Sequence, residues 1–206
     1  MQIFGGAQSD PHLRRWMLFV DGENFTLRAQ ALAEMNGLTL GAGRFYQRDV
    51  FLWMPETLAT LNIYHYGYLR IQDHAIRAHY YTSAVGDEAG LDDIREALKQ
   101  LGFQPFVFKK TRQEQKAKGV DIMLAKDLLS HAFFNNYDIA VLIAGDGDYV
   151  PLIEEVKRLG KVVYLAFFPQ SGLGLSDELR LAVDCFINLH PYFIQKWRDF
   201  ITGERH

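Results

Sequence analysis

The sequence predicts an α/β protein, folded as a three-layer α/β/α sandwich around a mainly parallel sheet. Two features of the chain support this fold class. Short, continuously apolar runs, such as residues 16–20 and 139–144, are typical of strands that are buried on both faces. Segments with apolar residues at helical spacing alternate with these runs. Such an alternation produces a parallel sheet that is covered by helices on both faces.

The individual elements follow from these two patterns in chain order. Most of the predicted strands are short apolar runs, and the predicted helices are amphipathic segments between them. Gly102 and Gly160 mark the ends of two helices, because glycine is common directly after a helix. The predicted strands cover residues 16–20, 77–85, 103–109, 138–144, 161–168 and 185–189. The predicted helices cover residues 23–35, 91–102, 120–134, 149–160, 176–184 and 191–201.

One domain accounts for most of the chain, and one segment interrupts it. Residues 36–76 are rich in aromatic side chains and fit neither the strand nor the helix period. We therefore expect an insertion there, a helix followed by a strand or hairpin at 61–69. Its aromatic part, 44–54, could be core, a substrate platform or the face of a homodimer. The predicted organisation is an N-terminal lead-in (1–15), a domain (16–190) with the insertion, and a C-terminal helix and tail (191–206).

Composition limits the partners and the compartment. The 206 residues carry a formal net charge of −3, so a nucleic-acid binder would need its positive charge to be local. The single cysteine, Cys185, cannot form an intrachain disulfide and matches no zinc pattern, which predicts a reducing, cytoplasmic setting. No apolar run approaches the ~20 residues that cross a bilayer, so we expect no membrane partner.

Acidic residues follow the predicted strands. Asp21 comes directly after the first strand, Asp146 and Asp148 come after the strand at 138–144, and Asp121 opens a helix. In a parallel α/β sheet these positions lie on one edge, so the four carboxylates can converge. They would repel one another unless a divalent cation neutralised them. Oxygen ligands alone suit Mg²⁺ or Mn²⁺.

Helix capping is the structural alternative for these acids. Aspartate is a favoured N-cap, so Asp121 or Asp148 taken singly is more often a cap than a ligand. Asp146 and Asp148 together exceed what one cap requires. By the same reasoning Glu23 and Asp127 are expected on solvated helix faces.

Four motifs carry a resemblance to a known family. In chain order they are FVDGENF (19–25), KGVDIMLAKDLL (118–129), DIAVLIAGDGDYVPLIEEVKRLGKVV (138–163) and LSDELRLAVDCFINL (175–189). Together they resemble the NYN domain family, whose bacterial members are often called LabA-like and which belongs to the PIN/FLAP-nuclease-like group. The resemblance implies a PIN-like sheet and an acidic, metal-dependent nuclease centre that most often acts on RNA.

The resemblance also implies roles for particular residues. The metal-binding, catalytic carboxylates would be Asp21, Asp121, Asp146 and Asp148. Asn24 would lie beside Asp21 and orient substrate or a metal-bound water. The sequence departs from the family at Ala144, where a serine is common.

A basic stretch precedes the second motif. Residues 109–119, KKTRQEQKAKG, contain five lysine and arginine side chains and lead into Asp121. Such a segment can contact phosphates without reading the base sequence. We expect Lys116 and Lys118 to contact substrate, and a solvated loop is the alternative.

The predicted function is a Mg²⁺- or Mn²⁺-dependent endoribonuclease that hydrolyses single-stranded or structured RNA. A regulatory RNA-binding or protein-interaction module with little turnover is the alternative from another class. A haloacid-dehalogenase-like phosphatase is disfavoured, because its D-x-D-x-[TV] motif would need a second aspartate where Glu23 stands.

Overall fold

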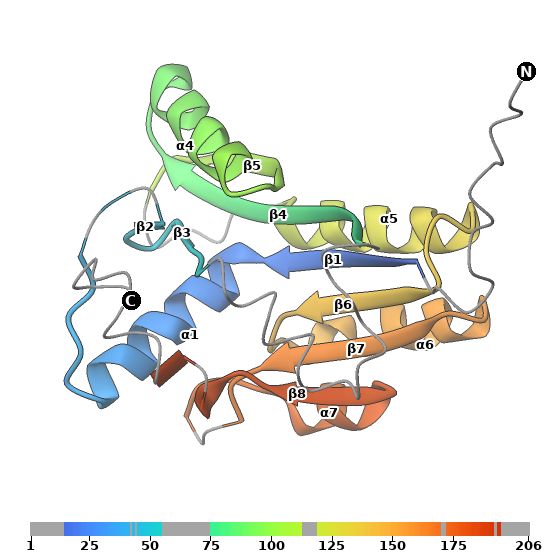
Figure 1. Ribbon diagram of the computed structural model, residues 1–206. Coiled ribbons are helices and arrows are strands. Elements are labelled where there is room, and N and C mark those ends of the chain that lie inside the picture. Colours follow the sequence, from blue (N-terminus) through green and yellow to red (C-terminus); the bar gives the residue numbers. More distant parts are fainter. Residues whose placement is uncertain are drawn as a thin grey trace, which may run out of the picture.

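The computed structural model describes residues 15–41, 43, 45–54, 75–112, 119–169, 172–191, 193 and 194 (Figure 1). Six parallel strands form its main sheet in the order β5-β4-β1-β6-β7-β8. The strands are β1 (Trp16–Asp21), β4 (Ala75–Val85), β5 (Gln104–Lys110), β6 (Ile139–Ile143), β7 (Val162–Phe167) and β8 (Cys185–Asn188). The helices are α1 (Gly22–Met35), α4 (Glu88–Gln100), α5 (Val120–Phe133), a 3-10 turn (Gly147–Tyr149), α6 (Val150–Arg158) and α7 (Asp177–Ala182).

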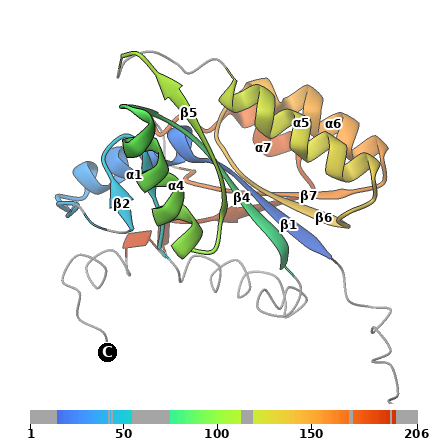
Figure 2. The same cartoon turned by 90° about the horizontal axis from the view of Figure 1, so that it is seen from above.

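The helices cover both faces of the sheet. Helices α1 and α4 lie on one face, and α5, α6 and α7 lie on the other (Figures 1 and 2). Strand β1 alternates between the two cores: Leu18 and Val20 face α1, whereas Met17 and Phe19 face α5. This is the three-layer α/β/α sandwich that the sequence predicts, and the predicted fold class is confirmed.

Part of the insertion, Tyr46 and residues 50–54, belongs to the core. The insertion contains a small antiparallel hairpin, β2 (Tyr46–Gln47) and β3 (Phe51–Leu52). Trp53 follows the hairpin and is 1% exposed, and its ring meets Phe103 edge-on with centroids 4.7 Å apart. Of the three possibilities for 44–54, the described residues fit the core. The strand or hairpin expected at 61–69 and Lys116 and Lys118 lie outside the described residues.

Two predicted helices differ from the observed ones. The helix expected at 149–160 is α6, which begins at Val150 and follows a separate 3-10 turn, Gly147–Tyr149, that Asp146 caps. Most of the helix predicted at 191–201 lies outside the described residues. The described part of the chain contains no helix with the length and apolar character that a membrane crossing requires.

Candidate active site

Asp21 lies at the carboxyl end of β1 and is almost completely buried. It is 4% exposed and serves as the N-cap of α1. Its Oδ1 accepts a hydrogen bond from the backbone N–H of Asn24 at 3.1 Å, and its Oδ2 accepts one from the Tyr149 hydroxyl at 3.0 Å. Burial raises the pKa of Asp21 to about 7, although the hydrogen bonds lower it and the charge of Asp121 adds to the increase. Its negative charge is therefore poorly compensated.

The Tyr149 hydroxyl joins Asp21 to a second carboxylate. It lies 3.0 Å from Asp21 Oδ2 and 3.2 Å from Asp121 Oδ1. A tyrosine hydroxyl carries one hydrogen and can donate fully to one acceptor at a time. Burial, together with both carboxylates, raises the pKa of Tyr149, so the phenol stays protonated. One neutral donor thus holds two acids that lie 100 residues apart in the sequence.

Asp121 comes from the first turn of α5, on the side of the site that faces solvent. The helix begins after Gly119, whose φ of 123° is one that other residues rarely adopt. The glycine of the KGVD motif therefore has a backbone role, and it sets the direction in which α5 presents Asp121. No side chain caps this helix, so Asp121 is a first-turn acid and not the cap.

Asp146 and Asp148 lie on the turn that follows β6. Asp146 caps the 3-10 turn, because its Oδ1 accepts from the N–H of Asp148 at 3.1 Å. Asp148 is exposed. Asn24 ties this turn to α1, since its Oδ1 accepts from the N–H of Gly145 at 3.0 Å. The side-chain oxygen of Asn24 thus links the end of β1 to the end of β6.

The four predicted carboxylates and Asn24 are therefore brought to one edge of the sheet by different means. Asp21 and Asp121 meet at one hydroxyl, and Asp146 and Asp148 occupy the adjoining turn. Among the described residues, no three or more His, Cys, Asp or Glu side chains are grouped as a metal site. The Asp21–Asp121 pair has the donor chemistry that a hard divalent cation requires, and a third carboxylate would have to come from the adjoining turn. Tyr149, which the sequence analysis did not single out, is the residue that connects the two halves.

Glu23, expected on a solvated helix face, is instead part of a buried polar cluster. Lys110 Nζ lies 3.2 Å from its Oε1, and Ser83 Oγ donates to its Oε2 at 2.6 Å. The Lys110 side chain is 3% exposed, so this member of the basic stretch contacts Glu23 and not solvent. Asp127 also departs from the expectation, because it is mostly buried and accepts a hydrogen bond from the Tyr81 hydroxyl at 3.0 Å.

The glycine of the DGEN motif has a packing role. A Cβ at Gly22 would overlap the ring of Tyr80, which is fully buried. The Tyr80 hydroxyl in turn bonds to the backbone of Leu52 and to Thr26. Glycine at this position therefore lets α1 begin directly against β4, which fixes the direction in which Asp21 points.

The model of the NYN domain family matches residues 15–190. The chain belongs to the NYN domain family. NYN domains have a PIN-like nuclease fold, in agreement with the six-stranded parallel sheet and its flanking helices. The nucleases of this group generally use divalent metal ions and act on nucleic acids.

A solved structure supports the fold of this NYN domain independently. It is the crystal structure of a protein of unknown function from Vibrio parahaemolyticus, which superposes with a TM-score of 0.59 at 20% sequence identity. The match covers 88% of this chain and 96% of the other. At this identity the likeness concerns the fold alone. No curated protein matches the chain.

Proposed function

We propose that this NYN domain is a metal-dependent endoribonuclease with Asp21, Asp121, Asp146 and Asp148 as its catalytic carboxylates. The observation that carries the proposal is the Asp21–Asp121 pair, which shares one neutral hydroxyl. Neither acid forms an ion pair with a described cationic side chain. Two close carboxylates in a partly buried site are stable as anions only when positive charge is supplied.

Mg²⁺ or Mn²⁺ would be held by Asp21 and Asp121 together with the acids of the adjoining turn. Bound there, the ion would lower the pKa of a coordinated water and stabilise the charge that develops on a phosphate. In the hydrolysis, the water oxygen bonds to phosphorus and the bond to the 3′ oxygen breaks, which leaves 5′-phosphate and 3′-hydroxyl ends.

The protein's own residues set the geometry of this edge. The N–H of Asn24 and the Tyr149 hydroxyl fix the orientation of the Asp21 carboxylate. The Oδ1 of Asn24 holds the turn of Asp146 against α1 through the N–H of Gly145. Asp121 and Asp148 are exposed, so a phosphodiester can approach them from solvent.

The alternative function is an RNA-binding or protein-interaction module with little turnover. It is favoured by the finding that no group of three potential metal ligands is assembled in the described residues. Ala144, in place of the common serine, points in the same direction.

The test is to incubate the purified protein with single-stranded RNA, hairpin RNA and matched DNA in Mn²⁺, Mg²⁺ or chelator. We expect metal-dependent cleavage of RNA, and its loss in Asp146→Asn without a change in the unfolding transition. Asp93→Asn is the matched control, because Asp93 is an exposed acid on α4 and should keep full activity. Unchanged turnover in Asp146→Asn would refute the site, and RNA binding without cleavage would favour the module.

A further inference from the structure

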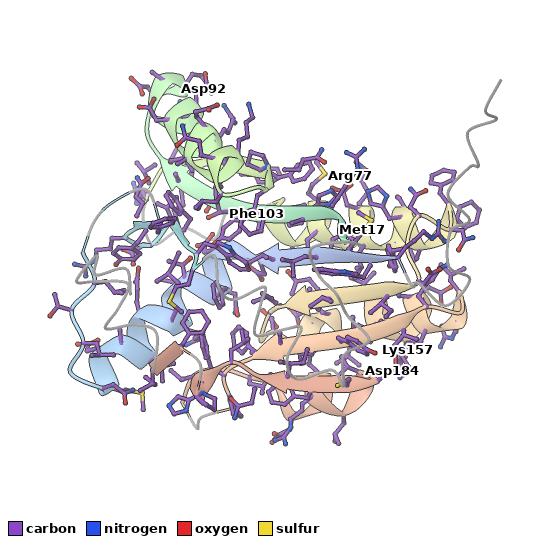
Figure 3. All side chains as sticks on the ribbon, viewed as in Figure 1. Met17, Arg77, Asp92, Phe103, Lys157 and Asp184 are labelled. Carbon is purple, nitrogen blue, oxygen red and sulfur yellow. The ribbon has the colours of Figure 1, made fainter. Side chains whose placement is uncertain are left out.

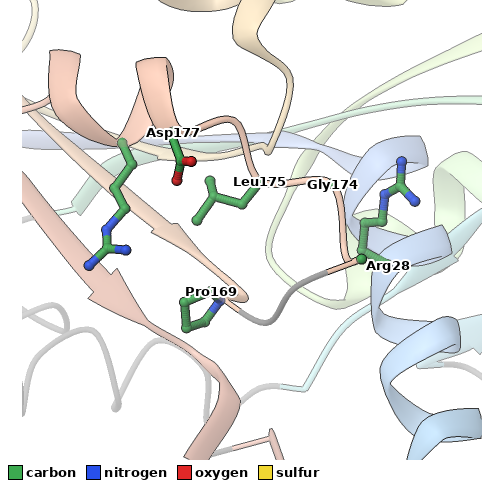
Figure 4. Close-up of a pocket in the computed structure, with 7 residues that line it drawn as sticks. Arg28, Pro169, Gly174, Leu175 and Asp177 are labelled. Atoms are coloured by element: carbon green, nitrogen blue, oxygen red, sulfur yellow. The ribbon is translucent and has the colours of Figure 1, made fainter.

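A cavity of about 570 Å³ lies between α1 and the loop that joins β7 to α7. Arg28 of α1 forms part of its wall, Pro169 and Leu175 come from the loop, and Arg180 comes from α7 (Figure 4). The volume is in the range of small-molecule and nucleotide sites. None of the four candidate catalytic carboxylates lines it, whereas Leu175, Asp177 and Arg180 belong to the motif at 175–189.

The cavity wall is attached directly to the turn that carries Asp146. The N–H of Ser176 donates to the carbonyl oxygen of Gly145 at 2.9 Å. A Cβ at Gly145 would lie 2.8 Å from the carbonyl oxygen of Gly174, so the loop and the turn are in close contact. On the other side, α1 reaches the same turn through Asn24, one helical turn before Arg28. The cavity therefore adjoins the acidic edge.

Two arginines, Arg28 and Arg180, line the cavity. The guanidinium group of Arg28 packs against Gly174, where an added Cβ would lie 2.7 Å from Arg28 Cζ and where φ is 70°. That of Arg180 lies 5.0 Å from the centre of the Phe186 ring. Within the described residues neither arginine forms an ion pair, although Asp177 lines the same cavity. Two arginines and one aspartate therefore line the cavity.

We propose that this cavity binds a backbone phosphate of the RNA strand next to the one at the acidic edge. Guanidinium groups match phosphate oxygens with paired hydrogen bonds. Because the carboxylates of the edge repel a polyanion, cationic side chains beside them are needed to hold the strand in place. Phosphate contacts position a strand without reading its sequence. This proposal rests on the proposed function in that it takes RNA as the ligand.

Replacement of Asp177 should change RNA affinity in the direction opposite to replacement of the arginines. The carboxylate of Asp177 opposes an anion in the cavity, so Asp177→Asn should bind RNA more tightly, by about threefold. A purely structural role of the loop would not produce tighter binding on removal of a charge.

The test measures binding of a labelled single-stranded RNA in chelator, where no metal-dependent cleavage occurs. Arg28→Gln/Arg180→Gln should weaken binding about tenfold and reduce the slope of log K against log salt by about 0.7 for one lost phosphate contact. Arg77→Gln is the control for the loss of an arginine: it removes one positive charge from an exposed site at the amino end of β4 (Figure 3) and should change neither quantity.

Two further variants guard against a folding defect. Arg180→Gln alone changes an exposed side chain, and it should give part of the same effect. Arg28→Lys keeps the charge and should retain the salt slope while losing affinity, since lysine lacks the planar fork. A double variant with the affinity and slope of Arg77→Gln would overturn the proposal, as would a wild type that does not bind RNA.

The outcomes separate this proposal from the proposed function. RNA binding that depends on the arginines, in a protein that cleaves nothing, would support the cavity and refute the nuclease. Metal-dependent cleavage with an unchanged KM in the double variant would support the nuclease and refute the cavity. A nucleoside monophosphate that binds in the cavity more tightly than RNA would assign it to a free nucleotide and overturn the strand proposal.

Discussion

Glu23 and Asp21 stand two residues apart at the start of α1, yet their surroundings differ in one decisive respect. Glu23 has a buried cation, Lys110, at 3.2 Å and a hydroxyl donor from Ser83. Asp21 is more deeply buried, and among the residues that the structure describes its donors are neutral, the N–H of Asn24 and the hydroxyl of Tyr149. Within the described part of the chain, the first acid has a cationic partner and the second has none.

The difference separates a structural carboxylate from a candidate functional one. A buried acid that already has its counter-charge holds elements together, here α1 to β4 and β5. A buried acid without one is held in place by the fold at a cost in stability, and such groups concentrate at functional sites. The four predictions below test this comparison.

The largest contrast is expected in catalysis. Asp21→Asn should lower metal-dependent RNA cleavage by about 10³-fold, because it removes a charge at the reacting centre, while the folded protein keeps its N-cap. Glu23→Gln, the matched change two residues away, should lower turnover per folded molecule by less than about threefold. The measurement is the rate of RNA cleavage at saturating Mn²⁺. Equal losses of cleavage rate in both variants would contradict the distinction between a functional Asp21 and a structural Glu23.

The second contrast is expected in stability. Lys110→Met leaves the Glu23 carboxylate without its cation and should lower the free energy of unfolding by about 3 kcal/mol. Glu23→Gln/Lys110→Met should recover a large part of this loss, since no buried charge is left unpaired. Urea unfolding of the single and double variants measures the effect. Additive losses in the double variant would show that the pair is not coupled.

The pH dependence of stability should separate the two acids further. The pKa of Asp21 is about 7 in the folded protein and near 3.8 when unfolded, so between these values only the folded state holds the proton. Stability from this group is present at low pH and lost as pH rises through about 7. The free energy of unfolding of Asp21→Asn, measured relative to that of the wild type in chelator, should therefore rise by about 2 kcal/mol between about pH 5 and pH 8.

His79 changes stability in the opposite direction, which is why the comparison with Asp21→Asn is needed. Burial lowers its pKa from 6.5 to about 4, so it favours the folded state above 6.5 and loses that contribution as pH falls towards 4. His79 is present in both proteins and cancels in the difference. A difference in unfolding free energy that stays constant with pH would contradict the assignment to Asp21.

The smallest effect is expected at Tyr149. Tyr149→Phe removes the hydroxyl that Asp21 and Asp121 share, and it keeps the ring in the core. We expect the Mn²⁺ concentration for half-maximal cleavage to rise about threefold to tenfold, because the two carboxylates lose their common donor. Turnover at saturating Mn²⁺ should change little. A large loss of turnover at saturation would instead place the hydroxyl in the chemical step.

The NYN resemblance and the fold class follow from local patterns, and both are confirmed. Apolar runs and helical spacing are properties of neighbouring residues, so they can be recognised without knowing the tertiary structure. The positions of Asp21 and Asp146 after strands have the same origin, since strand ends in a parallel sheet share one edge. The catalytic roles of the four acids stay a prediction.

The sequence by itself determined the order of strands and helices along the chain and the edge of the sheet on which the acids lie. Only the tertiary structure decided which acids have a counter-charge. Lys110 and Glu23 are 87 positions apart, and Tyr149 and Asp21 are 128 apart. Whether such residues meet depends on the order of the strands within the sheet and on the direction of each side chain. Neither property produces a periodic pattern in the sequence. The sequence therefore could not show that Lys110, a lysine in a basic stretch, is a buried partner of Glu23.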